Sequence, residues 1–163
     1  MTLERIDAKG VAELRANATN KYRLINVWAT WCAPCVEEFP VLVSLSRQFD
    51  MRDFELITLT VDDVKQEAKA KAFLERMHAG LTRNGKRLLE REGKGRTTNH
   101  YLVTEASSDA LFAALDDQAP GPIPHTVLVA PGGEIVWRHN GVIDRATAVS
   151  VIAEAMTRYY QPE

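Results

Sequence analysis

Cysteine is scarce in this chain of 163 residues, which has only two, and long apolar runs and a strong net charge are absent. Two cysteines cannot form a scaffold of several disulfides. No apolar run approaches the roughly 20 residues of a membrane-spanning helix. The net charge of −2 gives no general attraction to nucleic acid or to anionic lipid. These absences leave a globular protein whose one pair of cysteines is either redox-active or half of a metal site.

Composition and length fit a single folded domain over residues 1–163. Hydrophobic residues make up 45% of the chain and charged residues 26%, which is ordinary for a globular protein. The length suffices for one hydrophobic core and is short for two, and no internal repeat, low-complexity tract or linker divides it. The first residues contain no apolar segment, so no signal peptide is expected in the sequence as it stands. A chain trimmed of its leader would look the same.

The pattern of apolar residues predicts alternating strands and helices. Strands are expected at residues 21–29, 54–61, 99–104, 125–130 and 134–139. Helices are expected at residues 7–17, 36–49 and 64–78, from Ser107 or Ser108, and after Asp144, with a short helix in the stretch bounded by glycines at 85 and 93. This order predicts one α/β domain with a mixed sheet.

The two cysteines, Cys32 and Cys35, lie where the strand at 21–29 meets the helix that follows it. The N-terminus of a helix carries partial positive charge, which favours a thiolate at Cys32. Cys35, one turn later, can attack a mixed disulfide that Cys32 has formed. The alternatives are a static disulfide and half of a zinc site, but none of the four histidines has ligand spacing to this pair. Thiol–disulfide exchange is therefore our working hypothesis.

Two stretches carry a family resemblance. The first is Asn26-Val27-Trp28-Ala29-Thr30-Trp31-Cys32-Ala33-Pro34-Cys35 with Glu37-Glu38-Phe39-Pro40, and the second is Ile123-Pro124-His125-Thr126-Val127-Leu128-Val129 with Pro131-Gly132-Gly133-Glu134-Ile135. The first resembles the active-site segment of the TlpA/ResA-like thioredoxin-fold disulfide reductases, and the second resembles their cis-proline loop and the hairpin after it. The region 65–104 is similar to a redoxin-type subgroup with an extra strand and helix before the cis-proline. The resemblance implies a thioredoxin-like α/β fold, a central mixed β-sheet flanked by helices, with an inserted strand/helix region.

The two cysteines and the proline between them have distinct expected roles. Cys32 is expected to be the more exposed, attacking sulfur, and Cys35 the more buried, resolving one. Pro34 has no backbone N–H, so one contact that would stabilise a thiolate is missing. This should favour the reducing direction.

A second proline is implied to be part of the substrate site. The resemblance implies that Pro124 is cis, which would place Ile123 beside Cys32 and offer its backbone to an extended substrate segment. An ordinary trans proline is the alternative. Trp31 is expected on an exposed platform next to the site and Trp28 beneath the helix, and a merely structural role is the alternative for both.

The position of Asn26 points to an unusual proton acceptor. Cytoplasmic thioredoxins resemble this stretch but have a buried aspartate there, which accepts the proton of the resolving cysteine, whereas asparagine cannot titrate. Glu38 lies three residues after Cys35 on the same side of the helix and matches an acidic residue of membrane-associated relatives. We hypothesise that Glu38 relays the proton of Cys35 with a raised pKa. The alternative is a solvated helix glutamate, as we expect for Glu37.

His125 and the basic stretch at residues 63–96 each allow two interpretations. His125 follows the expected cis-proline, where a small or hydroxyl residue is usual in the family; it is either a group that stabilises the Cys32 thiolate or a surface histidine without such a role. Residues 63–96 contain ten lysines and arginines against five acidic residues. This stretch is either solvated or a docking surface for an acidic partner.

Together these features predict a thiol–disulfide oxidoreductase that reduces protein disulfides and needs no metal or organic cofactor, because the cysteine pair carries the electrons. The resemblance implies an extracytoplasmic protein, periplasmic or membrane-tethered, that acts as a monomer without nucleic acid or stable membrane insertion. Its partners would be a disulfide-containing protein and an upstream dithiol donor. Apocytochrome c, in cytochrome c biogenesis, and copper-site cysteines are substrates in this family.

Two other functions are possible on the same fold. Thiol peroxidases of the redoxin type have Thr or Ser three residues before the reactive cysteine, but Ala29 and Cys32 occupy those places here. Copper-delivery relatives space their cysteines by three residues instead of two and add a histidine ligand, for which His125 is the one candidate. Both patterns disfavour these alternatives.

Overall fold

The structure is a computed structural model that describes residues 1–105 and 107–159. Its strands are β1 Glu4–Ile6, β2 Tyr22–Trp28, β3 Phe54–Thr60, β4 His100–Val103, β5 His125–Val129 and β6 Ile135–Asn140. Its α-helices are α1 Ala8–Ala16, α2 Ala33–Gln48, α3 Glu67–Arg76, α4 Arg83–Glu92, α5 Ser108–Leu115 and α6 Arg145–Tyr159. A 3₁₀ turn at Val64–Gln66 precedes α3. No helix in the described ranges is both long and apolar enough to cross a membrane.

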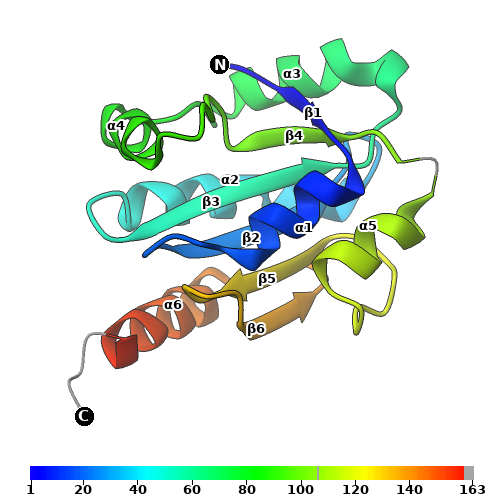
Figure 1. The fold of residues 1–163 in the computed structure, drawn as a ribbon. Coiled ribbons are helices and arrows are strands. Elements are labelled where there is room, and N and C mark those ends of the chain that lie inside the picture. Colours follow the sequence, from blue (N-terminus) through cyan, green and yellow to red (C-terminus); the bar gives the residue numbers. More distant parts are fainter. Residues whose placement is uncertain (106, 160–163) are drawn as a thin grey trace.

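The strands form one mixed sheet in the order β1-β4-β3-β2-β5-β6 (Figure 1). The first four strands in this order, β1, β4, β3 and β2, run parallel to one another. Strand β5 runs antiparallel to β2, and β6 runs antiparallel to β5. Every residue of β2 and β3 is buried. Such continuous burial is expected for central parallel strands that are covered on both faces. The predicted α/β fold with a central mixed sheet is therefore confirmed.

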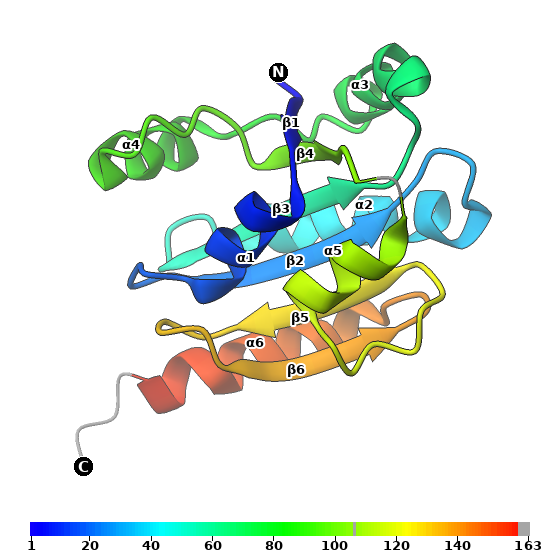
Figure 2. The same ribbon diagram turned by 45° about the vertical axis from the view of Figure 1, so that its right-hand side comes forward.

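Helices cover both faces of this sheet (Figure 2). On one face, α2, α3 and α6 pack on side chains such as Leu24 and Trp28 of β2. On the other face, α1 and α5 pack on Ile25 and Val27. Because successive side chains of a strand point to opposite faces, Asn26 points to the same side as Leu24 and Trp28, toward α2. The alternation of β2 thus brings a polar side chain beneath the cysteine helix.

The inserted region adds a strand inside the sheet. β4 lies between β1 and β3 and pairs in parallel with both. The predicted extra strand is therefore confirmed, but its partner β1 was not predicted from the sequence. The helix predicted at 64–78 is shorter, with a 3₁₀ turn before α3. Helix α2 begins at Ala33 instead of Val36, because Cys32 occupies its N-cap position.

A buried ion-pair cluster lies where β2 and β3 begin. Glu55 accepts hydrogen bonds from Lys21 at 3.0 Å and from Arg23 at 2.6 Å, and Arg96 lies 3.4 Å away. Glu92 of α4 pairs with Lys21 at 2.6 Å and with Arg96 at 3.1 Å. Burial would raise the pKa of Glu55, but the charges of Arg96, Lys21 and Arg23 lower it to about 2.

This cluster corrects the solvated interpretation of residues 63–96 at two positions. The side chains of Glu92 and Arg96 are only 8% and 12% exposed. The other nine lysines and arginines of the stretch are exposed, on α3, on α4 and in the loops next to them. Most of the basic stretch is therefore exposed, as both a solvated surface and a docking surface require, and its C-terminal end holds α4 on the sheet.

Replacing Glu55 by glutamine should lower the free energy of unfolding at neutral pH by about 3–5 kcal/mol, because three cations then share one buried carboxylate. Because its folded pKa is depressed, Glu55 contributes full stability above pH 4.5 and loses it as the pH falls toward about 2. Urea denaturation at several pH values measures both effects. The control is Glu154→Gln, which breaks the exposed pair with Arg158 and should cost about 0.5 kcal/mol or less. Equal losses in the two variants would contradict the account.

Candidate active site

The two cysteines form a disulfide at the start of α2, with a Cα–Cα distance of 5.3 Å. Cys32 is the N-cap residue of this helix, and the backbone N–H of Cys35 donates to Cys32 Sγ at 3.3 Å. Cys32 is 6% exposed and Cys35 is fully buried. A reagent in solution therefore reaches the sulfur of Cys32 first. Pro34 lies exposed in the first turn of the helix, between the two cysteines.

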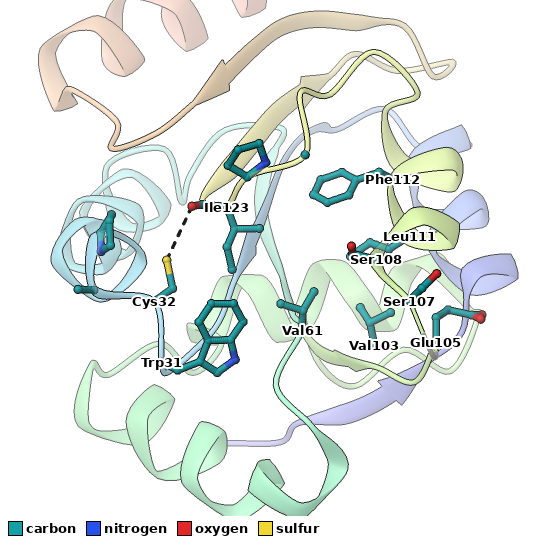
Figure 3. A pocket seen from close by; sticks show the side chains of 14 residues that line it. Trp31, Cys32, Val61, Val103, Glu105, Ser107, Ser108, Leu111, Phe112 and Ile123 are labelled. Carbon is teal, nitrogen blue, oxygen red and sulfur yellow. Dashed lines mark hydrogen bonds between the residues drawn. The ribbon is translucent and has the colours of Figure 1, made fainter.

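The loop before β5 brings a second element to Cys32. The Ile123–Pro124 peptide bond is cis, as the resemblance implied. The carbonyl oxygen of Ile123 lies 3.9 Å from Cys32 Sγ (Figure 3). Two hydrogen bonds hold this loop: Asn140 Nδ2 donates to the carbonyl of Pro122 at 2.7 Å, and the N–H of Gly141 donates to the carbonyl of Pro124 at 2.9 Å. The backbone of Ile123 is thereby presented beside the reactive sulfur.

His125 is buried, so the interpretation as a surface histidine is wrong. Its Nε2 lies 2.9 Å from Asp116 Oδ2, and its Nδ1 lies 3.4 Å from Asn140 Nδ2. Arg138 also donates to Asp116, from Nε at 2.9 Å and from Nη2 at 3.0 Å. Burial opposes ionisation of Asp116, but hydrogen bonds from Arg138 and His125 lower its pKa to about 2. The histidine therefore braces the cis-proline loop through its two neighbours.

Glu38 is buried beneath the active site, so the interpretation as a solvated glutamate is wrong. Its Oε1 accepts a hydrogen bond from Asn26 Nδ2 at 2.8 Å, and its Oε2 accepts one from the N–H of Ile143 at 2.9 Å. Burial raises the pKa of Glu38, while these two hydrogen bonds and the charge of His139 act in the opposite direction. Glu37, its neighbour in α2, is exposed as expected.

The two tryptophans of the motif lie in opposite environments. Trp28 is fully buried and packs against Phe39 of α2 and Phe73 of α3, with ring centroids 4.9 Å and 5.2 Å apart. Trp31 is 65% exposed at the rim of the site. Trp28 thus supports the cysteine helix from below, and Trp31 offers an apolar surface next to Cys32.

Sequence reasoning missed the acidic residues that hold the site's loops. Asp62 accepts hydrogen bonds from the N–H and the hydroxyl of Thr30 at 3.0 and 2.7 Å, which ties the turn before Cys32 to the end of β3. Asp116 contacts Nε2 of His125 at 2.9 Å and so holds the residue that follows the cis-proline. An acidic residue after a strand was a visible signal at Asp62, but its partner Thr30 is distant in sequence.

A cavity of about 670 Å³ opens beside Cys32. Trp31, Cys32 and Ile123 line one side, and Val103, Leu111 and Phe112 line the other (Figure 3). The cavity therefore joins the reactive sulfur to the inserted strand β4 and to α5. Among the described residues, no group of three or more His, Cys, Asp or Glu side chains is arranged to hold a metal ion.

Comparisons with known proteins identify the family and the fold of this chain. The Redoxin family model matches residues 8–156. Thiol-disulfide oxidoreductase ResA of Bacillus subtilis is 34% identical over 112 residues, which are 69% of this chain and 49% of ResA. Thiol:disulfide interchange protein HelX of Rhodobacter capsulatus is 35% identical over 65 residues, 40% of this chain and 34% of HelX. The matched part of the chain thus spans about half of the length of ResA and about a third of the length of HelX.

A crystal structure supports the fold independently of close sequence similarity. A thiol:disulfide interchange protein of the thioredoxin family from Chlorobium tepidum superposes with a TM-score of 0.61 at 20% identity. The match covers 91% of this chain and 89% of that one. The fold is therefore thioredoxin-like, as the sequence predicted, and the resemblance to the TlpA/ResA-like proteins is confirmed.

The raised pKa of Glu38 predicts how stability depends on pH. A group whose folded pKa lies above its unfolded value of 4.5 contributes stability below that pH and loses it as the pH rises through the folded pKa. The unfolding free energy of the oxidised protein, relative to that of Glu38→Gln, should fall by about 1.4 kcal/mol for each unit of pKa elevation. Urea denaturation from about pH 4 to 8 measures this difference. Exposed Glu37 supplies the control variant Glu37→Gln, and a pH-independent difference for Glu38→Gln would contradict the prediction.

Proposed function

Since the chain belongs to the redoxin family, we propose that it is a thiol–disulfide oxidoreductase that reduces protein disulfides through Cys32 and Cys35. The observation that carries the proposal is the position of the cysteine pair, at the first turn of α2 and directly beside the cis-proline loop. A disulfide kept only for stability needs neither a helix N-terminus nor an open cavity at one sulfur. We propose that the chain does this as a single thioredoxin-like domain.

In the first step, the Cys32 thiolate of the reduced protein attacks one sulfur of the substrate disulfide. A Cys32–substrate disulfide forms, and the other substrate sulfur leaves as a thiolate that takes up a proton. The N–H of Cys35 donates to Cys32 Sγ, and the N-terminus of α2 adds partial positive charge. Both favour the thiolate form of Cys32. The backbone of Ile123 and the exposed ring of Trp31 would hold the substrate segment.

In the second step, Cys35 loses its proton and its thiolate attacks Cys32 Sγ. The Cys32–Cys35 disulfide forms, and the second substrate thiolate leaves. The electron pair that cleaved the substrate disulfide has then come from the two cysteines, and the product is the disulfide state that the structure shows. An upstream dithiol donor must reduce the pair for the next cycle. The couple itself carries the electrons, so the proposal includes no metal or organic cofactor.

We propose that Glu38 takes the proton of Cys35 in the second step. Cys35 is fully buried, so its proton has no direct path to solvent. Glu38 lies three residues further along the same side of α2, and burial raises the pKa of its carboxyl. A carboxyl whose pKa is raised toward neutral pH suits a proton acceptor better than an ordinary one does. Asn26 positions this carboxylate through its 2.8 Å hydrogen bond.

The proposal extends to compartment and partners on the strength of the resemblance. An extracytoplasmic location, periplasmic or membrane-tethered, fits TlpA/ResA-like proteins, and the substrate would be a disulfide-containing protein such as those of cytochrome c biogenesis. The chain would act as a monomer. The copper-delivery alternative has less support, because Asp116 and Asn140 lie against both ring nitrogens of His125.

Cys32→Ser should reduce insulin disulfides no faster than dithiothreitol alone, because no sulfur remains at the accessible position. Turbidity from precipitating insulin B chain measures the rate. Circular dichroism and urea denaturation against the reduced wild-type protein serve as the control for folding. Activity above the dithiothreitol background in this variant would overturn the mechanism.

Glu38→Gln should change the titration of the Cys35 thiol. With glutamate present, the thiol and the carboxyl are expected to titrate as a coupled pair, whereas glutamine leaves one thiol titration with a lower apparent pKa, because no carboxylate opposes a second negative charge. The rate of Cys35 alkylation against pH, followed by mass spectrometry in a Cys32→Ser background, measures this. Glu37→Gln should leave the profile unchanged. An unchanged profile in Glu38→Gln would remove Glu38 from the mechanism.

A further inference from the structure

The cavity beside Cys32 has one chemical character near the sulfur and another at its far end. Its size, about 670 Å³, lies within the range of about 300–1,000 Å³ over which proteins bind ligands. From Cys32 across the cavity, Ile123 and Val61 come first, and Phe112 and Leu111 continue the apolar lining on the other side (Figure 3). At the far end lie Glu105 and the hydroxyls of two serines, Ser107 and Ser108. The lining of the cavity thus changes from apolar next to the reactive sulfur to polar and acidic at the far end.

Among the described residues that line the cavity, Glu105 is the only charged one. Its Oε1 accepts a hydrogen bond of 2.7 Å from the N–H of Ala8, at the start of α1. This bond anchors the carboxylate in one place. Within the described ranges, no lysine or arginine forms an ion pair with Glu105 at 4.0 Å or less. The carboxylate is therefore held at the start of α1 without a paired lysine or arginine among the described residues.

The two ends of the cavity come from different parts of the chain. The apolar end includes Ile123 of the cis-proline loop and Val61, which directly follows β3, and both side chains pack against the hydrophobic core. The far end comes from Glu105 and Ser107, which follow β4, and from Ser108 at the start of α5. The N-terminus of α2 thus supplies the reactive sulfur, and the segment that follows β4 supplies the charge.

We propose that this cavity selects protein substrates that carry a bulky apolar side chain close to the reacting cysteine and a lysine or arginine beyond it. The inference rests on the proposed function and names its substrate class. A substrate segment that pairs with the backbone of Ile123 as a strand presents alternate side chains to one face. The residue two positions from the substrate cysteine therefore enters the apolar end, and a longer cationic side chain further on reaches Glu105.

The two ends of the cavity contribute differently to the binding free energy of a substrate. Burial of a Phe or Leu side chain against the apolar lining supplies most of the affinity, because its apolar surface leaves water. The pair between the cation and Glu105 is partly solvated, so it contributes discrimination of about fivefold and weakens with salt. An acidic side chain in the same place is repelled by Glu105, which disfavours such segments.

Peptides with one cysteine, linked by a disulfide to 5-thio-2-nitrobenzoate, test the proposal, because reduction releases a coloured thiolate. The residue two positions from the cysteine is Phe or Asn, and a later residue is Lys or Glu. For the reduced wild-type protein, kcat/KM should be highest for the Phe and Lys peptide. The Lys peptide should exceed the Glu peptide about fivefold at low salt, and the ratio should shrink as salt is added.

Glu105→Gln should abolish the preference for Lys over Glu while keeping that for Phe over Asn, because the amide oxygen can still accept from Ala8. The matched control is Asp109→Asn, which removes an exposed acidic residue of α5 that does not line the cavity and should keep both preferences. The salt series on the wild-type protein tests the charge preference even if Glu105→Gln does not fold.

Each other outcome overturns a definite part of the account. Equal kcat/KM for all four peptides, with release that still depends on Cys32, overturns the selectivity and leaves the proposed function standing. Reduction of glutathione disulfide as fast as the best peptide, unaffected by Glu105→Gln, also overturns it in favour of small disulfides. No release from any peptide and no insulin reduction overturn the proposed function itself.

Discussion

The contact on which the site depends is the hydrogen bond from the N–H of Cys35 to Cys32 Sγ, at the first turn of α2. It makes the reactive sulfur the cap of a 16-residue helix, so the sulfur receives the partial positive charge of the helix N-terminus. Trp28 and Phe73 support that helix from below, and Asp62 ties the preceding turn to β3. The sheet thus serves to hold one sulfur at one helix end, next to the backbone of Ile123.

Two buried carboxylates show how the same fold sets opposite proton affinities. Glu55 is surrounded by Lys21, Arg23 and Arg96, and these cations lower its pKa to about 2 despite burial. Within the described part of the chain, Glu38 accepts hydrogen bonds from two neutral groups, the amide of Asn26 and the N–H of Ile143, and its pKa is raised by burial. A carboxylate that stays charged stabilises the junction of β2, β3 and α4. A carboxyl with a raised pKa binds a proton more tightly than an ordinary carboxyl does. This property suits a group that lies beneath a thiol and exchanges a proton with it.

Much of the fold and the centre of the site could be predicted, because they depend on contiguous residues. The strands around Ile25 and Ile57 and the cysteine junction each show their pattern within a few positions. The rest depends on distant partners. Strand β1 has no apolar alternation and exists because Glu4 lies opposite Tyr101 in β4. The burial of His125 likewise requires Asp116 and Asn140, which no local pattern links to it.

The order of attack by the two cysteines is tested most directly by mapping a trapped intermediate. Cys35→Ser protein is mixed with a disulfide-bonded peptide, and mass spectrometry locates any adduct. The account predicts an adduct on Cys32 that persists, because no resolving thiol remains to displace the peptide. Absence of any adduct, or an adduct formed equally well on Cys35 in Cys32→Ser protein, would contradict it.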